Sequence, residues 1–319
     1  MKNISEGTGP SPSGSHAFSG ITLVVLAAGS GSRFGGLKQL APLGPAGNVL
    51  LEYSIYDAMR AGFSKIVLVI RRSCVDQFTK ALINLPKQLE IRFVFQEQLT
   101  GAPGERSKPW GTAHALLAAR RHVTEPFVLC NADDYYGTSA FRRAADYLLS
   151  EPFNPDRYGM LAYTLCKTLP KQGEVSRGLC HLTDAGQLDS IVEHLRISVS
   201  GDDIISADEH GNASMLHESD IASMNFWMFA PSVFPRLQAS FESFARRSGQ
   251  DPCAEFQLPT FISDLLHRGE IAVDCVPHDE AWFGLTYRED HDRAAKTIQQ
   301  LHDAGLYPAP LWQSVPGDR

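Results

Sequence analysis

The sequence lacks the features that would point to nucleic-acid or membrane binding. Its 319 residues carry a formal net charge of -7, with 29 Lys and Arg against 36 Asp and Glu, so there is no basic excess to attract an anionic polymer or an anionic membrane. No uncharged apolar run approaches the roughly 20 residues that a membrane-spanning helix needs. We therefore expect a cytoplasmic protein that binds neither nucleic acid nor membranes.

Metal-thiolate and redox motifs are missing as well. The 6 cysteines are scattered singly, with no C-x-x-C pair and no Cys/His ligand spacing, which favours reduced thiols in an intracellular protein. The first 20 residues are rich in Ser, Gly and Pro but contain no apolar segment of the kind found in a signal peptide. We expect residues 1–20 to form a disordered tail.

What the sequence does contain is a regular alternation of buried strands and amphipathic helices. Largely apolar runs at 21–28, 65–70 and 127–130, together with a strand pattern at 90–95, alternate with helical patterns at 49–61, 75–85 and 112–121. This order predicts an α/β fold with a doubly wound, mostly parallel Rossmann-like sheet and helices on both faces.

The second half is less regular. Strands are predicted at 160–166, 178–182, 188–192, 222–230 and 271–276, and helices at 232–246, 256–267 and 289–304. The turn Asp184-Ala185-Gly186 predicts a β-hairpin excursion, and the polar segment 198–219 is interpreted as an exposed loop or an insertion. We expect one domain over 21–305, made of a first half (21–135) and a second half (136–305), with a C-terminal tail (306–319).

A glycine-rich loop with two cations follows the first strand. The segment from Gly29 to Lys38 reads G-S-G-S-R-F-G-G-L-K, with Arg33 as the first cation. Glycines let backbone N–H groups surround a phosphate, and the cations supply matching charge. A tight turn explains the glycines equally well, but the cations favour phosphate. Gln39 after Lys38 excludes a P-loop, and the late third glycine argues against a dinucleotide fingerprint.

The run from Leu26 to Lys38 resembles the L-A-A-G-x-G-x-R…K signature of the nucleotidyltransferases that make nucleotide sugars and related activated compounds. The resemblance implies that Arg33 grips a triphosphate and that Lys38 bridges the phosphates of both substrates. It also implies a nucleotide-binding segment made of Leu26, Ala27, Ala28, Gly29, Ser30 and Gly31.

Two further segments are similar to the same family and occur in the same order. Gln96 ends a strand, and Gly111-Thr112 opens a helix as in the family's G-T-A-x-A turn. The resemblance implies that Gln96 and Gly111 contact the base, with Thr112 beside them. A solvated strand end explains Gln96 about as well, and a helix N-cap explains Gly111-Thr112.

An apolar strand at 127–130 leads to the acidic pair Asp133-Asp134. Ligands of open α/β sheets bind beyond the carboxyl ends of strands, and adjacent carboxylates there repel one another unless a cation relieves them. Mg²⁺, which uses one or two carboxylates plus substrate phosphates, suits such a site. Asp133 is the predicted ligand, and Asp134 is the second candidate, for which a solvated turn acid is the better alternative.

The predicted hairpin is similar to the sugar-binding hairpin of the sugar-phosphate branch. The resemblance implies acceptor contacts from Gly178, Glu193, Asn225 and Glu255. His194 departs from the lysine that usually follows the glutamate. Asn225 could instead satisfy a strand edge, and Glu255 could be a helix N-terminal acid.

The clearest departure is Gly284, which stands where this branch commonly carries a second metal-binding aspartate, two residues after Trp282. Asp279 and Asp290 are nearby substitutes. The T-Y-R-E-D segment that follows is reminiscent of the isoprenoid and molybdenum-cofactor branches.

The resemblance implies transfer of a nucleoside monophosphate from a triphosphate to a sugar 1-phosphate, with release of pyrophosphate and with UTP or dTTP favoured by Gln96. Cytidylyl transfer to an alcohol phosphate is an alternative, and a non-catalytic nucleotide-binding regulator is another because of Gly284. The expected partners are a nucleoside triphosphate and a small phosphorylated acceptor. The sequence leaves homo-oligomerisation open.

Overall fold

The computed structural model describes residues 20–29, 37–96, 109–150, 154–170, 173–201, 203–207, 212–248, 250–285 and 290–312. In this part of the chain the strands form an 11-stranded sheet and a separate 2-stranded one. No described helix is long and apolar enough to cross a bilayer.

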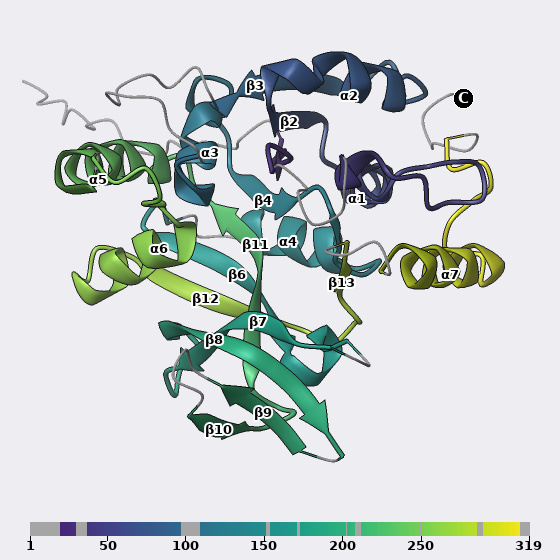
Figure 1. Cartoon of the computed structure of the whole chain (residues 1–319). Helices are drawn as coiled ribbons and strands as arrows, with labels where there is room; N and C mark the ends of the chain where they lie inside the picture. The colour runs from purple at the N-terminus through teal and green to yellow at the C-terminus, as the bar shows by residue number, and fades with distance from the viewer. Residues whose placement is uncertain are drawn as a thin grey trace, which may run out of the picture.

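The first half of the chain forms the parallel core of the large sheet. β1 lies between β4 and β2, β3 lies outside β2, and all three pairings are parallel. These strands are β1 (Thr22–Leu26), β2 (Lys65–Ile70), β3 (Glu90–Phe95) and β4 (Phe127–Asn131), at the top of Figure 1. All lie where the sequence predicts strands.

Helices cover both faces because successive strand residues point to opposite sides. Leu23 and Val25 belong to a core with α1, α2 and α4, whereas Val24 and Leu26 belong to a core with α3, α5 and α6. The helices are α1 (Leu50–Arg60), α2 (Val75–Ala81), α3 (Thr112–Ala118), α4 (Ala140–Leu148), α5 (Val233–Ser248), α6 (Leu258–His267) and α7 (Asp290–Asp303). The predicted α/β sheet with helices on both faces is confirmed.

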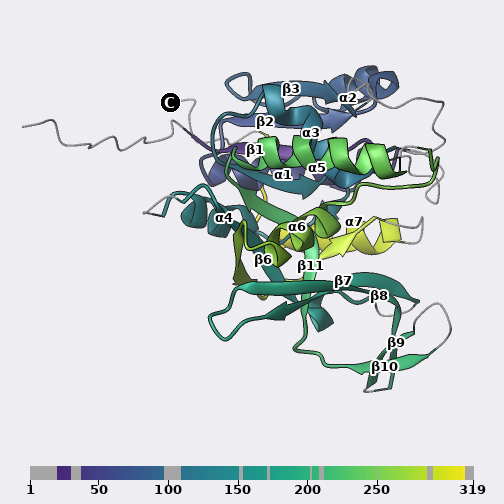
Figure 2. The same ribbon diagram turned by 90° about the vertical axis from the view of Figure 1, so that its left-hand side faces the viewer.

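The second half extends the sheet mainly by antiparallel pairing. β11 pairs antiparallel with β4, β6 and β7, and β12 pairs parallel with β6. β7, β8, β9 and β10 then follow in order to the far edge, which projects at the bottom of Figures 1 and 2. The bounds are β6 (Arg157–Thr164), β7 (Val175–Leu182), β8 (Leu188–Ser200), β9 (Asp203–Ala207), β10 (Ala213–Leu216), β11 (Ile221–Phe229) and β12 (Ala272–His278).

The predicted hairpin is confirmed, but the predicted loop at 198–219 is wrong. β8 continues to Ser200, and β9 and β10 follow it within that segment. The segment has few large apolar residues because only one side of these strands is covered: Ile204 and Leu216 are buried, while Met215 is exposed. A sheet with one solvated face needs apolar residues at alternate positions only.

β11 changes its neighbour halfway along its length. Ile221–Ser223 pair with β7 on one edge, whereas Trp227–Phe229 pair with β4 on the same side of the strand. The register on β6 shifts between these two segments, and Asn225 within the irregular stretch has a positive φ of 56°. The end of β4 and the start of β7 therefore meet at this irregular stretch.

The C-terminal part packs more extensively than the sequence suggests. Residues expected to begin a tail at 306 include Tyr307 and Leu311, which are buried with residues of α1 and α7. The indole N–H of Trp312 donates a 2.6 Å hydrogen bond to Glu52. The packed structure thus continues to at least residue 312.

Candidate active site

The carboxyl ends of β1 and β4 lie side by side, since Leu26 is opposite Asn131 in the parallel register. Gly29, just beyond β1, is exposed, and its carbonyl oxygen accepts a 3.3 Å hydrogen bond from the side chain of Gln39. The predicted residues that precede Gly29 are buried: Leu26, Ala27 and Ala28. Ser30, Gly31 and Arg33 lie outside the described residues, so their roles stay predictions.

Lys38 and Asp133 form an ion pair across this edge. Lys38 begins the short helix η1 (Lys38–Leu40), and its Nζ contacts Oδ2 of Asp133 directly after β4. The two side chains are 20% and 17% exposed. The pair joins the two segments that the sequence predicts to bind phosphate. A lysine that reaches solvent beside a carboxylate can exchange that partner for phosphate oxygens.

Asp134 is buried, so the structure contradicts the alternative of a solvated turn acid. Its Oδ2 accepts hydrogen bonds from Asn131 at 2.8 Å and from the hydroxyl of Tyr136 at 3.1 Å. Burial raises the pKa of Asp134 to about 7, and the negative charge of Asp133 adds to the effect. Whether Asp134 binds metal stays a prediction.

Gly284 lies opposite Asp134, because β13 (Phe283–Gly284) pairs with β5 (Asp134–Tyr135). A Cβ at position 284 would lie 2.5 Å from Oδ1 of Asp134 and 2.9 Å from the ring of Trp282. The position therefore accepts only glycine in this arrangement. An aspartate placed there would collide with Asp134.

The substitutes for that missing ligand do not gather at the site. Asp279 is exposed, and Asp290 pairs with Arg293 at 2.7 Å. Within the described ranges, no three His, Cys, Asp or Glu side chains form a group that could hold a metal ion. The acidic pair Asp133-Asp134 is what this edge of the sheet offers a cation.

The predicted base contacts are brought together. Gln96 is buried, and its amide nitrogen donates to the carbonyl of Gly111 at 3.1 Å and lies 3.3 Å from Nδ1 of His114. These contacts occupy the amide nitrogen and orient the side chain, which contradicts a solvated strand end. The end of β3 and the turn into α3 are therefore joined at one place, and contact with the base stays a prediction.

Gly111 and Thr112 also have a structural role. Gly111 has a φ of 102°, and a Cβ there would lie 2.6 Å from the carbonyl oxygen of Phe256. The Thr112 hydroxyl accepts a 2.9 Å hydrogen bond from the backbone N–H of Leu258, at the start of α6. The turn into α3 is thus fastened to the segment before α6, and its helix-boundary role holds alongside the predicted nucleotide contact.

Asn225 connects β11 to the acidic pair. Its amide nitrogen donates to Oδ1 of Asn131 at 2.7 Å, and Asn131 in turn donates to Asp134. Its own oxygen accepts a 3.1 Å hydrogen bond from the indole of Trp227. The sequence gives no role to Asn131, which ends the strand that leads to Asp133. In the structure it is the link between the two halves of the site.

Gly178 and Glu193 face each other across the β7–β8 hairpin. They pair in the antiparallel register, and Glu193 Oε2 lies 3.7 Å from the Cβ position of Gly178. Partial burial raises the pKa of Glu193, although the charge of Arg177 opposes this shift. His194, which stands in place of the expected lysine, bonds Ser206 on β9 at 3.0 Å.

Glu255 is not drawn into this cluster. It is exposed and accepts a 3.2 Å hydrogen bond from Gln257. Its neighbour Phe256 packs against Gly111, on the nucleotide side. Of the four predicted acceptor residues, Glu255 therefore lies near Gly111, apart from the other three.

Arg177 is a residue that the sequence analysis missed. It precedes Gly178 on β7, and its guanidinium lies over the ring of Trp282 at 4.7 Å from the centroid. The only sequence signal that could have found it is a charged residue directly before Gly178, where the predicted hairpin begins. The negative charges of Asp134 and Glu193 both act on it.

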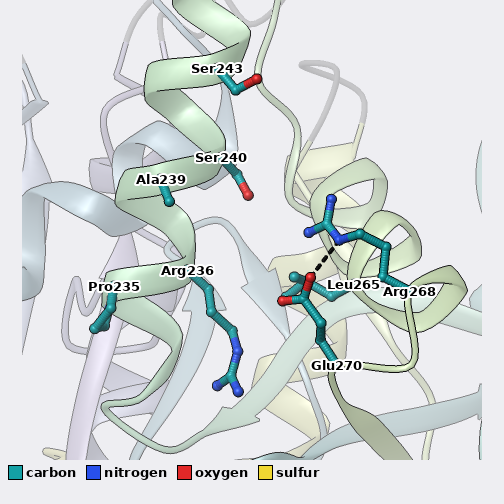
Figure 3. Close-up of a pocket in the computed structure, with 8 residues that line it drawn as sticks. All are labelled: Pro235, Arg236, Ala239, Ser240, Ser243, Leu265, Arg268 and Glu270. Carbon is teal, nitrogen blue, oxygen red and sulfur yellow. Dashed lines mark hydrogen bonds and ion pairs between the residues drawn. The ribbon is translucent and has the colours of Figure 1, made fainter.

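A separate pocket of about 420 Å³ lies between α5 and α6 and is lined by residues that include Arg236, Arg268 and Glu270. Figure 3 shows Arg268 turned to Glu270, with which it pairs at 2.6 Å. None of its lining residues is a predicted site residue. The pocket contributes nothing to the chemistry described above.

Comparison with known proteins agrees with this geometry. Residues 23–151 match the MobA-like NTP transferase domain, a stretch that runs from β1 past the acidic pair. This part of the chain is therefore similar to a MobA-like NTP transferase domain, and the protein is an enzyme of the nucleotidyltransferase class. A non-catalytic regulator is therefore not the interpretation that we retain.

Three relatives extend the similarity over most of the chain. The UTP–glucose-1-phosphate uridylyltransferase AglF of Haloferax volcanii is 22% identical over 284 residues, which cover 87% of this chain and 96% of that protein. The inositol-1-phosphate CTP transferase of T. maritima aligns with a TM-score of 0.59 at 16% identity, over 89% and 98% of the two chains. A UDP-glucose pyrophosphorylase solved with UDP-glucose gives a TM-score of 0.57 at 15% identity, over 88% and 98%.

Proposed function

We propose that the protein transfers a uridylyl or thymidylyl group from UTP or dTTP to a sugar 1-phosphate, giving a nucleotide sugar and pyrophosphate. The observation that carries the proposal is the Lys38–Asp133 ion pair at the edge shared by β1 and β4. Asn225 connects this edge to β11, which also pairs with β7 of the β7–β8 hairpin, here called the acceptor hairpin. We infer that one continuous site serves donor and acceptor. The uridylyltransferase similarity supports the same substrates.

In the proposed reaction, a phosphate oxygen of the acceptor attacks the α-phosphorus of the triphosphate. One oxygen–phosphorus bond forms, the bond between the α-phosphorus and its bridging oxygen to the β-phosphate breaks, and pyrophosphate leaves with the electron pair. A phosphate monoester is already largely ionised at neutral pH, so no general base is required. Positioning and charge neutralisation then account for catalysis, with Lys38 close to the phosphates.

The residues present fit a magnesium ion held in a sparse site. Asp133 is partly exposed, whereas Asp134 is buried and bonded to Asn131 and Tyr136, so Asp133 is the principal protein ligand that we propose. Mg²⁺ commonly combines one or two carboxylates with substrate phosphates. When bound, the ion would neutralise charge on the triphosphate.

Gln96 favours a pyrimidine base in this proposal. Its amide nitrogen is engaged by Gly111 and His114, so the amide oxygen is the group left to accept a hydrogen bond from the N3–H of uracil or thymine. Cytosine carries no N–H at N3. The orientation of Gln96 therefore supports UTP or dTTP over CTP.

Cytidylyl transfer to an alcohol phosphate is the second candidate, and one observation favours it. Glu255 lies on the nucleotide side and is exposed, so the acceptor residues expected of the sugar-phosphate branch do not all gather around Glu193. The fold shared with a CTP transferase is compatible with this alternative.

Pyrophosphate release distinguishes these proposals. The full chain would be assayed with Mg²⁺ against UTP, dTTP, CTP, ATP and GTP, each combined with sugar 1-phosphates and alcohol phosphates. We expect release with UTP or dTTP and a sugar 1-phosphate. Release confined to CTP and an alcohol phosphate would establish the second candidate, and no release with any pair would overturn both.

A further inference from the structure

Arg177 lies where the two halves of the sheet separate. Gly178, the next residue, pairs with Ser223 on β11, just before β11 leaves β7 for β4. Asp134 and Glu193, which lie on either side of this separation, are the carboxylates that act on its charge. Arg177 thus belongs to the acceptor hairpin and interacts electrostatically with both Glu193 and the acidic pair Asp133-Asp134 through Asp134.

The guanidinium is held in place without an ion pair. Nη2 donates to the carbonyl of Thr168 at 2.5 Å, Nη1 donates to the carbonyl of Ser176 at 2.8 Å, and Nε donates to the Thr168 hydroxyl at 3.3 Å. A guanidinium has five N–H donors, so one on each terminal nitrogen is left. No carboxylate of the described chain comes within the 4.0 Å distance of an ion pair with it.

Partial burial makes this arrangement unfavourable for the cation in the free enzyme. Desolvation lowers the pKa of Arg177 to about 10, even though Asp134 and Glu193 act in the opposite direction. A partly desolvated cation is stabilised most by an anion that meets its free donors. Two carbonyl oxygens and a hydroxyl can also accept hydrogen bonds from a neutral side chain. A purely structural role for Arg177 would therefore not require its positive charge.

Trp282 supplies a second donor in the same place. Its ring lies under the guanidinium, and its Nε1–H is buried with no hydrogen-bond partner in the described structure. The Cζ2 and Cη2 edge of the ring, on the nitrogen-bearing side of the indole, faces Gly284 and therefore Asp134. A buried N–H without a hydrogen-bond partner is rare in proteins and destabilises the folded chain.

We propose that Arg177 and Trp282 form a preorganised cradle for an oxyanion of the acceptor, with the guanidinium as the charged donor and the indole N–H as the neutral one. The proposal deepens the proposed function and rests on it for the identity of the acceptor. Two sources supply the same chemistry: the reacting phosphate of the sugar 1-phosphate and the carboxylate of an acidic sugar. Planar donors of this kind suit either group.

Binding by calorimetry tests the cradle on the full chain without any turnover. The probes are inorganic phosphate, glucose 1-phosphate, glucuronate and glucose, each titrated into the wild type, Arg177→Gln, Arg177→Lys and Trp282→Phe. Arg157→Gln is the matched control, because Arg157 is a strand arginine of β6 that pairs with Asp274 away from the site. Thermal melts and UTP titrations on each variant report whether the fold and the donor half persist.

We expect Arg177→Gln to weaken glucose 1-phosphate binding 10- to 100-fold, on the order of one charge-assisted hydrogen-bond pair, with UTP affinity changed less than about twofold. Arg177→Lys should recover part of the loss, and Trp282→Phe should lose a few-fold in affinity. Loss for both glucose 1-phosphate and phosphate identifies the phosphate as the ligand. Loss for glucuronate alone identifies a carboxylate.

Unchanged oxyanion binding in folded Arg177→Gln and Trp282→Phe would overturn the cradle, as would the absence of oxyanion binding by the wild type. If Arg177→Gln does not fold, Arg177→Lys and Trp282→Phe decide the matter. The proposed function fails separately. If the wild type binds glucose 1-phosphate through Arg177 yet releases no pyrophosphate with any triphosphate, the cradle stands and the transferase proposal falls.

Discussion

At the scale of single residues, Lys38 and Lys65 form two ion pairs of closely similar exposure. Each lysine is 20% exposed and pairs with an acid of 17–18% exposure, Asp133 in one case and Glu125 in the other. Lys65 begins β2, so it lies at the opposite end of the sheet from the candidate site. The two lysines differ in location far more than in environment. Lys65 is therefore a control for the loss of one largely buried ion pair.

We expect Lys38→Ala to reduce kcat/KM by at least about 100-fold, as for removal of a charge-stabilising donor, while the melting temperature changes no more than in Lys65→Ala. Lys65→Ala should keep near-normal activity. Pyrophosphate release and thermal melts measure the two effects. Near-normal activity in Lys38→Ala would contradict the assignment of the loop after β1.

Asp57 is a single residue whose ionisation makes the stability of the fold depend on pH. It is buried on α1 and accepts a 2.5 Å hydrogen bond from the hydroxyl of Tyr307, while its Oδ1 has no partner in the described structure. Burial raises the pKa of Asp57 from 3.8 to about 8, although the hydrogen bond from Tyr307 opposes this shift. The folded protein therefore holds this proton over a pH range in which the unfolded chain has released it.

The sign of the effect follows from linkage. The contribution of Asp57 to stability is fully present below pH 3.8, falls by up to about 1.4 kcal/mol per pH unit as the pH rises, and is lost above pH 8. We expect Asp57→Asn, which cannot ionise, to flatten the decline of the urea-unfolding free energy between pH 5 and 8. Asp76→Asn, at an exposed position, is the control. Equal slopes for Asp57→Asn and the wild type would show that Asp57 ionises normally.

At the scale of elements, the short pairing of β5 with β13 places Gly284 against Asp134. We expect Gly284→Ala to lower the free energy of unfolding by about 1–3 kcal/mol, because the added Cβ overlaps Oδ1 of Asp134 and the ring of Trp282. Gly284→Asp should be at least as destabilising and should not raise activity, although it restores the acid common in the sugar-phosphate branch.

Urea denaturation and pyrophosphate release measure the two quantities. Gly20→Ala is the control, since a Cβ there meets only the Ser64 hydroxyl at an ordinary 3.4 Å. An active, stable Gly284→Asp variant would show that Asp134 can move aside. It would also return position 284 to the list of metal-ligand candidates.

The same scale shows what the sequence could predict and what it could not. Strands such as Lys65–Ile70 were predicted to the residue because a strand buried on both faces is an almost continuous apolar run. β9 and β10 were missed because strands with one solvated face carry polar residues at every second position. Local pattern therefore identifies the central strands better than the peripheral ones.

Site residues divide in the same way. Gln96 and Gly111 were predicted together because the family motif orders them, and the structure joins them. Arg177 was missed because its significance comes from Trp282, which lies more than one hundred residues later in the sequence and reaches it only through the fold. The register shift in β11 that positions Asn225 likewise depends on three partner strands at once.

At the scale of the whole molecule, the C-terminal segment anchors α7 to α1. Tyr307 contacts Asp57 and Tyr135, Leu311 is fully buried, and Trp312 bonds Glu52. Tyr135 directly follows the acidic pair, so this segment also supports the carboxyl end of β4. Removing it should affect stability and the candidate site together.

We expect a chain ending at 304 to lose several kcal/mol of unfolding free energy, since burial of a large side chain contributes about 1.5–3 kcal/mol. A chain ending at 312 keeps every one of these contacts and should melt like the full chain. Differential scanning calorimetry on the two truncations gives the comparison. If both truncations melt alike, the packing of Tyr307 and Leu311 contributes nothing measurable.

The neighbour exchange along β11 has a consequence for divergence within such enzymes. The hydrogen-bonded pairing that attaches β7 to the central sheet runs through Ile221–Ser223, while Trp227–Phe229 keep β4 in place independently. An insertion or exchange in the β7–β10 lobe could therefore change the proposed acceptor hairpin without disturbing the register that holds Asp133 beside Lys38. Under the proposed function, acceptor choice and nucleotide activation can then evolve separately on one sheet.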